Sequence, residues 1–268
     1  MLAIVLSCDR YSVFRNHMIL QYAALWKTHP FRFRIPFQKE KDSTPLVGIT
    51  HEFIKTPLDI KRCVLALLAN LDDEEWIFWC IDDKYPVTID ADVFQQCHDW
   101  VLRLEDTSVA GITLCRPTSL TRPSLMNYED VIQAPWDEQL IGRPHYKQIW
   151  LHQFVRTKVI RTLFQAFPDT PFKPKEMDVF HCNAKRPVDH RLFVARSSHA
   201  VFGESTTRGQ ATTNCADSLL QWGFELPQGM TVSGKSKLIG RPKKSLRSMF
   251  RRTHEYFRLP GIVPTNQK

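Results

Sequence analysis

The stretch Trp76-Ile-Phe-Trp-Cys-Ile81, followed at once by Asp82-Asp83-Lys84, decides the fold class. Six apolar residues that end abruptly in charged ones are typical of a strand buried on both faces of a parallel sheet. Residues 2–7 have the same character. Further strands are predicted at 31–37, 52–55, 108–114 and 191–195, and helices at 16–27, 60–70, 91–104, 146–167 and 216–222. This alternation predicts an α/β fold, a single domain with a mainly parallel central sheet flanked by helices.

Three other segments predict local structure. Thr56-Pro57 is expected to start a helix, with the threonine as N-cap and the proline in the first helical position. Residues 126–144 are interpreted as a long irregular connection, and residues 202–214 as a polar loop.

Composition narrows the class of protein. The 268 residues are 43% hydrophobic and 24% charged, which is ordinary for a packed globular chain. No apolar run approaches the roughly 20 residues of a transmembrane helix. The opening Met1–Asp9 lacks a basic segment before its apolar run, which favours a core strand over a signal peptide. Seven cysteines without C-x-x-C spacing favour a reducing, cytoplasmic location over a disulfide framework or a zinc site.

The net charge of +8 comes from residues 234–268, which hold ten Lys or Arg and one acid and so carry +9, whereas residues 1–233 carry −1. Residues 234–244 are interpreted as a linker and 245–258 as a basic amphipathic helix. Such a helix fits the inner face of an anionic membrane, at roughly 1 kcal/mol per basic residue. Docking on its own domain or binding to a partner stays open, and nucleic acid is the least favoured. We therefore predict a folded domain at 1–233 and a basic tail at 234–268.

Charged and polar residues follow two of the predicted strands, Ser7-Cys8-Asp9 after the first and Asp82-Asp83 after the central one. Open α/β sheets bind ligands at the carboxyl ends of their strands. Two adjacent carboxylates at such a rim repel each other unless a cation shares them, and Mg²⁺ or Mn²⁺ binds through carboxylates together with substrate phosphates. A solvated surface turn is the alternative. The absence of G-x-G-x-x-G and G-x-x-x-x-G-K-[ST] disfavours a dinucleotide-binding dehydrogenase or a P-loop NTPase.

Four motifs taken in order resemble GT-A-type glycosyltransferases of the small bacterial or viral kind that build surface polysaccharides. They are S-C-D-R-Y (7–11), T-P-L-D-I-K-R (56–62), W-I-F-W-C-I-D-D-K-Y-P (76–86) and F-G-E-S-T-T-R-G-Q-A-T-T-N (202–214). The resemblance implies a GT-A-like, Rossmann-like domain with a nucleotide-binding half (1–115) and an acceptor half (116–233). It also implies a nucleotide-sugar donor, and an acceptor hydroxyl on a polysaccharide or a lipid-linked glycan. A tail bound at the membrane would bring the catalytic domain to such an acceptor.

Roles follow from the resemblance at matching positions. Asp83 would contact a divalent metal (Mn or Mg), and Asp82 would hold the ribose, the donor sugar or the same metal. The sequence departs from the family in having no third acid two places on, and Lys84 would then supply part of the cation's role. Residues implied in nucleotide binding are Ser7, Asp9, Tyr11, Lys61 and Arg62, although Lys61 and Arg62 also fit an exposed helical face.

A general base must take the proton of the acceptor hydroxyl in an inverting transferase. Glu204 is the first candidate, Asp178 the second and Asp189 the third, each with a surface carboxylate as the alternative. The polar residues that would hold diphosphate or acceptor oxygens are Arg208, Thr206, Thr207, Thr212 and Thr213. Trp136 and Trp150 are possible sugar platforms, or buried core residues.

Two other functions remain open. A nucleotidyltransferase also pairs carboxylates with a metal at a sheet edge, and differs in which moiety of the donor is transferred. A non-catalytic module would use its basic tail to bind membrane or nucleic acid. In that case loss of residues 234–268 would abolish function, whereas Asp83→Asn and Glu204→Gln would not.

Overall fold

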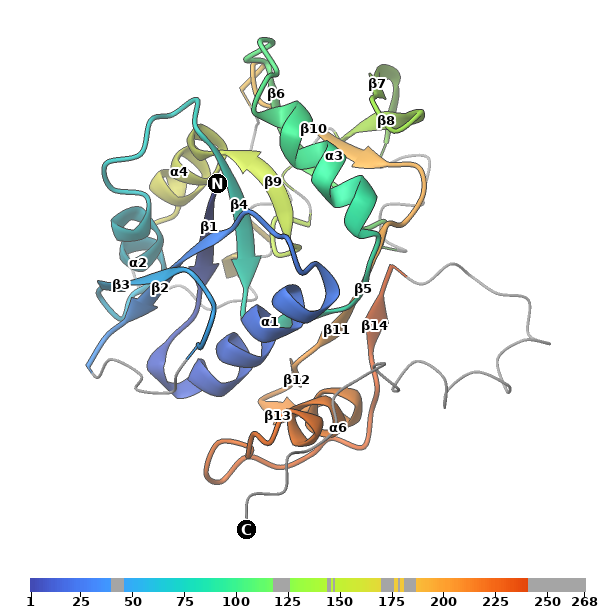
Figure 1. Cartoon of the computed structure of the whole chain (residues 1–268). Helices are drawn as coiled ribbons and strands as arrows, with labels where there is room; N and C mark the ends of the chain where they lie inside the picture. Colours follow the sequence, from blue (N-terminus) through green and yellow to red (C-terminus); the bar gives the residue numbers. More distant parts are fainter. Residues whose placement is uncertain are drawn as a thin grey trace, which may run out of the picture.

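A nine-stranded sheet forms the centre of the molecule (Figure 1). The computed structural model describes residues 1–39, 46–117, 126–143, 146, 148–169, 176–177, 179–180 and 187–240. The strand order is β3-β2-β1-β4-β9-β6-β10-β8-β7. The bounds are β1 (Leu2–Leu6), β2 (Arg32–Phe37), β3 (His51–Lys55), β4 (Trp76–Ile81), β6 (Val109–Thr113), β7 (Asn127–Ala134), β8 (Glu138–Arg143), β9 (Gln153–Arg156) and β10 (Arg191–Ala195).

The sheet is mixed, although most of its strands run in one direction. Strands β3, β2, β1 and β4 are mutually parallel, and β6 is parallel to β10. Strand β9 lies antiparallel between β4 and β6, and β8 lies antiparallel between β10 and β7. The predicted α/β class is confirmed, and these two reversed strands modify the mainly parallel sheet that the sequence predicted.

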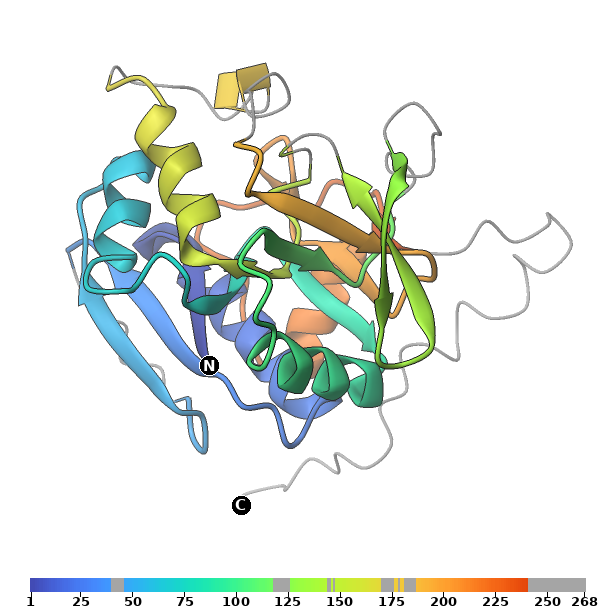
Figure 2. The same cartoon turned by 90° about the horizontal axis from the view of Figure 1, so that it is seen from above.

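Helices cover both faces of this sheet (Figure 2). On one face, α1 (Ser12–Leu25) and α3 (Ala91–Val101) pack on Val5 and Phe78. On the other face, α2 (Ile60–Leu67) and α4 (Thr157–Ala166) pack on Ile4 and Trp79. Neighbouring residues of β1 and β4 alternate between the two cores, as the period of two along a strand requires. Both central strands are therefore almost fully buried, and only their ends reach solvent.

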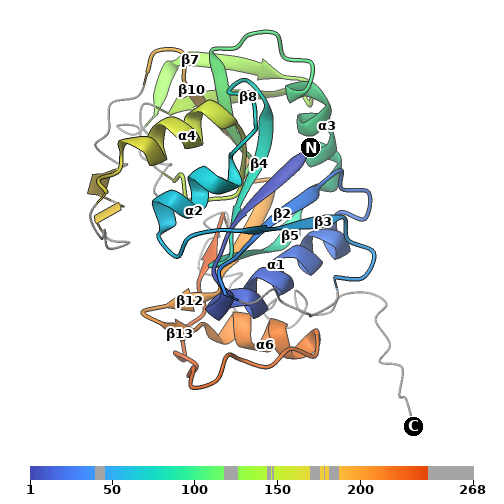
Figure 3. The same ribbon diagram turned by 90° about the vertical axis from the view of Figure 1, so that its left-hand side faces the viewer.

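A second, three-stranded sheet extends from the carboxyl ends of β1 and β4 (Figures 1 and 3). It consists of β11 (Ala200–Glu204) with β5 (Lys84–Ile89) and β14 (Leu238–Ile239) on its two sides, each antiparallel to it. The small hairpin of β12 (Thr206–Thr207) and β13 (Gln210–Ala211) and then α6 (Thr213–Gln221) follow β11. This unit brings residues more than a hundred positions apart to one edge of the central sheet.

Several segment predictions were wrong. Residues 126–144 contain the β7–β8 hairpin, residues 202–214 contain the end of β11 and the β12–β13 hairpin, and the first part of 146–167 contains β9. All four residues of β9, two of them polar, are buried between β4 and β6, so this strand shows no alternation of apolar and polar residues. The N-cap of α2 is Asp59, whose carboxylate accepts from the backbone N–H of Arg62 at 2.8 Å. Pro57 therefore lies before the helix.

The tail is described only in part. Residues 238–239, inside the predicted linker, form β14 and pair with β11. The predicted helix at 245–258 lies outside the described residues. Within the described ranges, no helix combines the length and the apolar character that crossing a membrane requires.

Gly203 on β11 provides a test of how this second sheet is packed. A Cβ at this position would lie 2.5 Å from the ring of Tyr85 on β5, whose hydroxyl accepts a hydrogen bond from Asn214 at 2.7 Å. We expect Gly203→Ala to lower the free energy of unfolding by about 1–3 kcal/mol, because the ring must move out of a filled core. Urea denaturation measures this. A variant as stable as wild type would show that the β5–β11 contact is looser than described.

Candidate functional site

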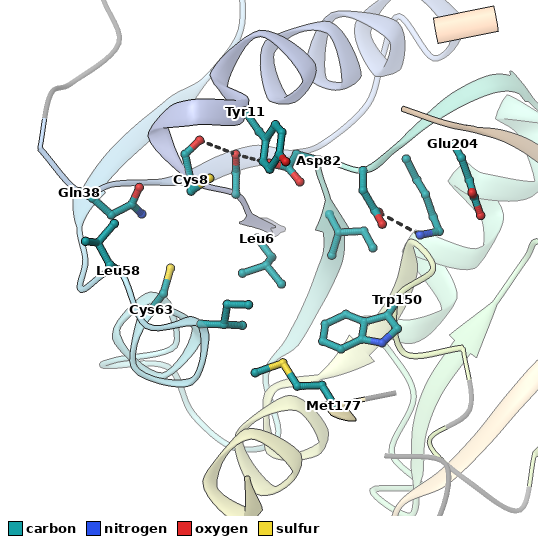
Figure 4. A pocket seen from close by; sticks show the side chains of 15 residues that line it. Leu6, Cys8, Tyr11, Gln38, Leu58, Cys63, Asp82, Trp150, Met177 and Glu204 are labelled. Carbon is teal, nitrogen blue, oxygen red and sulfur yellow. Dashed lines mark hydrogen bonds and ion pairs between the residues drawn. The ribbon is translucent and has the colours of Figure 1, made fainter. Parts of the chain in front are cut away.

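A pocket of about 440 Å³ lies at the carboxyl ends of β1 and β4 (Figure 4). Its residues come from the loop after β1, the end of β2, the start of α2, the β4–β5 junction and the end of β11. Two ends are distinguishable: Cys8, Gln38, Leu58 and Cys63 lie at one, and Glu204 and Trp150 at the other. The lining residues are Leu6, Ser7, Cys8, Tyr11, Gln38, Leu58, Ile60, Cys63, Ile81, Asp82, Asp83, Lys84, Trp150, Met177 and Glu204.

Asp82 lies between the two ends of the pocket. Its Oδ2 accepts a hydrogen bond from the Ser7 hydroxyl at 2.6 Å, which joins the ends of β4 and β1. Burial raises the pKa of Asp82 to about 7 against the opposing effect of the Ser7 hydrogen bond, and the charge of Asp83 adds to the rise. This carboxyl group therefore titrates in the neutral range rather than near pH 4.

Asp83 and Lys84 form an ion pair beside it. The Lys84 ammonium lies 2.9 Å from Asp83 Oδ1; the Lys84 side chain is 9% exposed and that of Asp83 is 50% exposed. Lys84 begins β5, so the strand that starts directly after the two acids carries its own cation into the pocket. The sequence predicted the end of β4 here but did not predict β5, because β5 is a strand only through its pairing with β11, which is distant in sequence.

Glu204 reaches the same pocket from β11, where it is the register partner of Lys84. Its Oε1 lies 2.6 Å from the Lys237 ammonium, and its side chain is 17% exposed. The next residue, Ser205, fixes this arrangement: its backbone N–H donates to Asp83 O at 2.7 Å and its hydroxyl to Asp82 O at 3.0 Å. The predicted first candidate for the base is thus held opposite the two acids by backbone contacts.

The other end of the pocket is held open by Asp9, which does not line it. The Asp9 carboxylate accepts from the backbone N–H groups of Gln38 at 2.9 Å and Lys39 at 2.7 Å, and its own N–H donates to Gln38 Oε1 at 2.9 Å. Gln38 Nε2 in turn donates to Thr56 at 3.1 Å. Sequence reasoning missed Gln38, because nothing in the pattern around the end of β2 distinguishes it.

Among the predicted nucleotide contacts, Ser7, Tyr11 and Asp82 line the pocket. Lys61 instead donates to Phe167 O at 2.5 Å and lies 2.7 Å from Asp169, which ties α2 to the end of α4. Arg62 is exposed on α2. Neither Lys61 nor Arg62 is among the described residues that line the pocket. Their contact with a nucleotide stays a prediction.

Some of the predicted acceptor-side residues lie at the pocket and others do not. Trp150 lines the pocket, and Trp136 packs edge-to-face on Trp100 instead. Arg208 is exposed in the turn between β12 and β13 with φ of 52°, and Thr207 pairs with Gln210 beside it. The carboxylate of Asp189 lies 3.5 Å from the Lys158 ammonium, whereas Asp178 lies outside the described residues. The roles of these residues stay predictions.

The residues around Asp82 and Asp83 do not fit a divalent cation. The Lys84 ammonium, on a side chain that is 9% exposed, already lies 2.9 Å from Asp83 Oδ1, so a cation at Asp83 would have to displace a buried positive charge. In the part of the chain that the structure describes, no group of three or more His, Cys, Asp or Glu could hold a metal ion. The Mn or Mg contact expected from the resemblance stays a prediction that this donor set does not support.

His152 supports the strand end that carries the two acids. Its Nε2 lies 3.0 Å from the Ile81 carbonyl and its Nδ1 2.7 Å from the Tyr22 hydroxyl. Burial lowers the pKa of His152 to about 3, so the ring is neutral at pH 7. Neutral imidazole has one donor and one acceptor, which fits Nε2–H donating to Ile81 and Nδ1 accepting from Tyr22.

His152→Phe is expected to lower the free energy of unfolding by about 1–3 kcal/mol at pH 7, because the Ile81 carbonyl and the Tyr22 hydroxyl lose a partner in the core. Urea denaturation measures the loss. Tyr22→Phe is the matched variant, since it removes one of the two bonds and is expected to cost less. Equal stability of His152→Phe and wild type would show that His152 does not support the end of β4.

Comparisons with known proteins concern the fold. The sequence matches no family model and no curated protein. The galactosyltransferase LgtC, solved with donor and acceptor sugar analogs, is similar at 8% identity and a TM-score of 0.40, over 72% of this chain and 73% of that one. TarS of S. aureus is similar at 10% identity and a TM-score of 0.43, over 74% of this chain and 36% of that one.

A cytidylyltransferase of Francisella tularensis, which acts on 2-C-methyl-D-erythritol 4-phosphate, is also similar, at 9% identity and a TM-score of 0.36, over 83% of this chain and 97% of that one. A galactosyltransferase and a cytidylyltransferase are thus both among the structures that this chain is similar to.

Proposed function

We propose that this protein is a glycosyltransferase that moves a sugar from a nucleotide-diphosphate sugar to an acceptor hydroxyl. The observation that carries the proposal is the pocket at the ends of β1 and β4. It joins a half-buried, largely apolar end to an end with paired charges and a carboxylate from another strand. A donor of this class has the same polarity, because its base is flat and weakly polar whereas its diphosphate and sugar are charged and hydroxylated.

In this proposal the base lies at the end lined by Cys8, Tyr11 and Gln38. The ribose would lie over Ser7 and Asp82, which offer a hydroxyl and a carboxyl group. The diphosphate would then reach Asp83 and Lys84, and the sugar would lie between Glu204 and Trp150. Tryptophan presents an apolar face on which the carbon–hydrogen side of a sugar ring can pack.

The chemistry requires a base and a leaving group. The acceptor oxygen forms a bond to the anomeric carbon while the bond from that carbon to the diphosphate oxygen breaks, and the electron pair leaves with the nucleoside diphosphate. The acceptor proton goes to Glu204, whose carboxylate is held beside the Lys237 ammonium at 2.6 Å. Because the residues do not fit a divalent cation, no step is assigned to one.

The acceptor in this proposal is a polysaccharide or a lipid-linked glycan at an anionic membrane, and residues 245–258 would bind that membrane. The charge of the tail and the resemblance support this part. Removal of 241–268 is expected to reduce binding to vesicles that contain anionic lipid, while hydrolysis of the donor in solution stays within about threefold of wild type.

Mass spectrometry of the products tests the reaction class. A mixture of nucleotide sugars is incubated with the protein and a set of glycan acceptors. The proposal predicts release of a nucleoside diphosphate and an acceptor heavier by one sugar residue. Release of a sugar 1-phosphate, with a nucleoside monophosphate left on the acceptor, would assign the protein to the nucleotidyltransferases instead. Release of pyrophosphate when nucleoside triphosphates and a sugar phosphate replace the nucleotide sugars would do the same.

A further inference from the structure

Lys84 is the one cation among the described residues that line the pocket. It is the first residue of β5, and it lies next to Asp83 in sequence and opposite Glu204 in register. Its ammonium therefore stands at the charged end of the pocket, paired with Asp83 and on the strand next to that of Glu204.

The hydrogen bonds of Lys84 are incomplete. An ammonium group has three donors, and in the described part of the chain the only acceptor recorded for Nζ is Asp83 Oδ1 at 2.9 Å. A side chain that is 9% exposed has little water to satisfy the other two donors. Two donors therefore remain for a ligand with several negative oxygens.

The charges around Lys84 are arranged so that such a ligand can replace its present partner. Glu204 already has its own cation in Lys237, at 2.6 Å. Asp82 Oδ2 already accepts a hydrogen bond from the Ser7 hydroxyl at 2.6 Å. Asp83 is 50% exposed, so water can solvate its carboxylate when the ammonium turns to another anion, whereas the buried ammonium continues to need one.

We propose that Lys84 binds the diphosphate of the donor and neutralises the leaving group, so that the protein binds its nucleotide without a divalent cation. The inference rests on the proposed function and adds to it the source of the positive charge. It replaces the Mn or Mg contact at Asp83 with a contact from the chain itself. An ammonium that donates to phosphate oxygens forms charge-assisted hydrogen bonds, which are about twice as strong as neutral ones.

Calorimetric titration in EDTA tests the inference, with the nucleoside diphosphate and the monophosphate of the same base as probes. Wild type is expected to bind the diphosphate in EDTA, and excess Mn²⁺ or Mg²⁺ is expected to change its Kd less than threefold. Lys84→Gln is expected to weaken binding of the diphosphate about 10- to 100-fold and of the monophosphate less than threefold. Lys84→Arg keeps the charge and should retain most of the affinity.

Two controls make the result specific. Lys27→Gln removes one positive charge from an exposed position after α1 and should leave both affinities unchanged. Binding of the monophosphate shows that each variant is folded and that its base and ribose contacts are intact. Equal weakening of both ligands by Lys84→Gln, or no weakening, would overturn the role of Lys84.

The outcomes also separate this inference from the proposed function. Diphosphate binding that requires Mn²⁺ or Mg²⁺, with at least a tenfold gain over EDTA, would overturn the inference and leave the transferase proposal in place. Failure of wild type to bind any nucleoside diphosphate, with or without metal, would overturn both.

Discussion

Glu204→Gln is expected to lower the rate of sugar transfer about 100- to 10,000-fold, the range that loss of a general base usually costs. Glutamine has nearly the same size as glutamate, so the contact with Lys237 and the packing at the end of β11 are kept. Affinity for the nucleoside diphosphate should stay within threefold, because the base acts on the acceptor. Initial rates at saturating donor measure the first quantity, and calorimetry measures the second.

Glu52→Gln is the matched control for this prediction. Glu52 also lies on a strand in a pair with a basic residue, Arg34, at 2.7 Å, and it lies on β3 outside the residues that line the pocket. Its transfer rate should equal that of wild type. A Glu204→Gln variant that keeps a third or more of the wild-type rate would show that another group takes the proton.

Asp82→Asn is expected to make the protein more stable at alkaline pH. An acid whose pKa is raised from 3.8 to about 7 by folding contributes stability below pH 4, and this contribution is lost as pH rises through 7. Asparagine is neutral throughout and can accept the same hydrogen bond from Ser7. At about 1.4 kcal/mol per pH unit, the stability of wild type relative to Asp82→Asn should fall by up to about 4 kcal/mol between pH 4 and pH 8.

Urea denaturation of both proteins at each pH from 4 to 8 measures this difference. The comparison isolates Asp82, because the neutral buried histidines His17 and His152 titrate equally in both proteins. The charges that face Asp82, those of Asp83, Arg15 and Lys84, are also the same in both. Parallel curves of stability against pH would contradict the assignment of a raised pKa to this carboxyl group.

The sequence predicts the framework of the site well, because the framework depends on short-range patterns. Trp76–Ile81 is a strand with the predicted bounds, since a run of six apolar residues that ends abruptly in charged ones is typical of a strand at the centre of a sheet. Asp82 and Ser7 then meet because the carboxyl ends of adjacent parallel strands share one edge. That Glu204 lies near them follows from no local pattern; the resemblance alone indicated it.

The residues that the sequence did not reveal depend on distant pairing. Lys84 looks like part of a turn after β4, yet it begins a strand because β11 pairs with it from residue 204. Gln38 lines the pocket because Asp9, 29 positions away, binds the backbone at the end of β2. Strand β9 is too short to show a period of its own. In each case the partner, rather than the segment, decides the structure.

The labelling rate of Cys8 measures directly whether a nucleotide occupies the pocket at the ends of β1 and β4. Among the six cysteines within the described ranges, Cys8 is partly accessible and the other five are buried. Burial and the charge of Asp82 raise the pKa of its thiol, so labelling with N-ethylmaleimide is slow near neutral pH and is followed at pH 8.5. Mass spectrometry of the peptides separates Cys8 from every other cysteine.

We expect at least one of UDP, GDP, CDP, dTDP and ADP to slow modification of Cys8 at least fivefold in EDTA. The same nucleotide should protect at a concentration close to its Kd from calorimetry. An unchanged rate of Cys8 labelling with all five nucleotides, at concentrations up to 5 mM and both in EDTA and with added Mn²⁺, would contradict the claim that this pocket holds the donor.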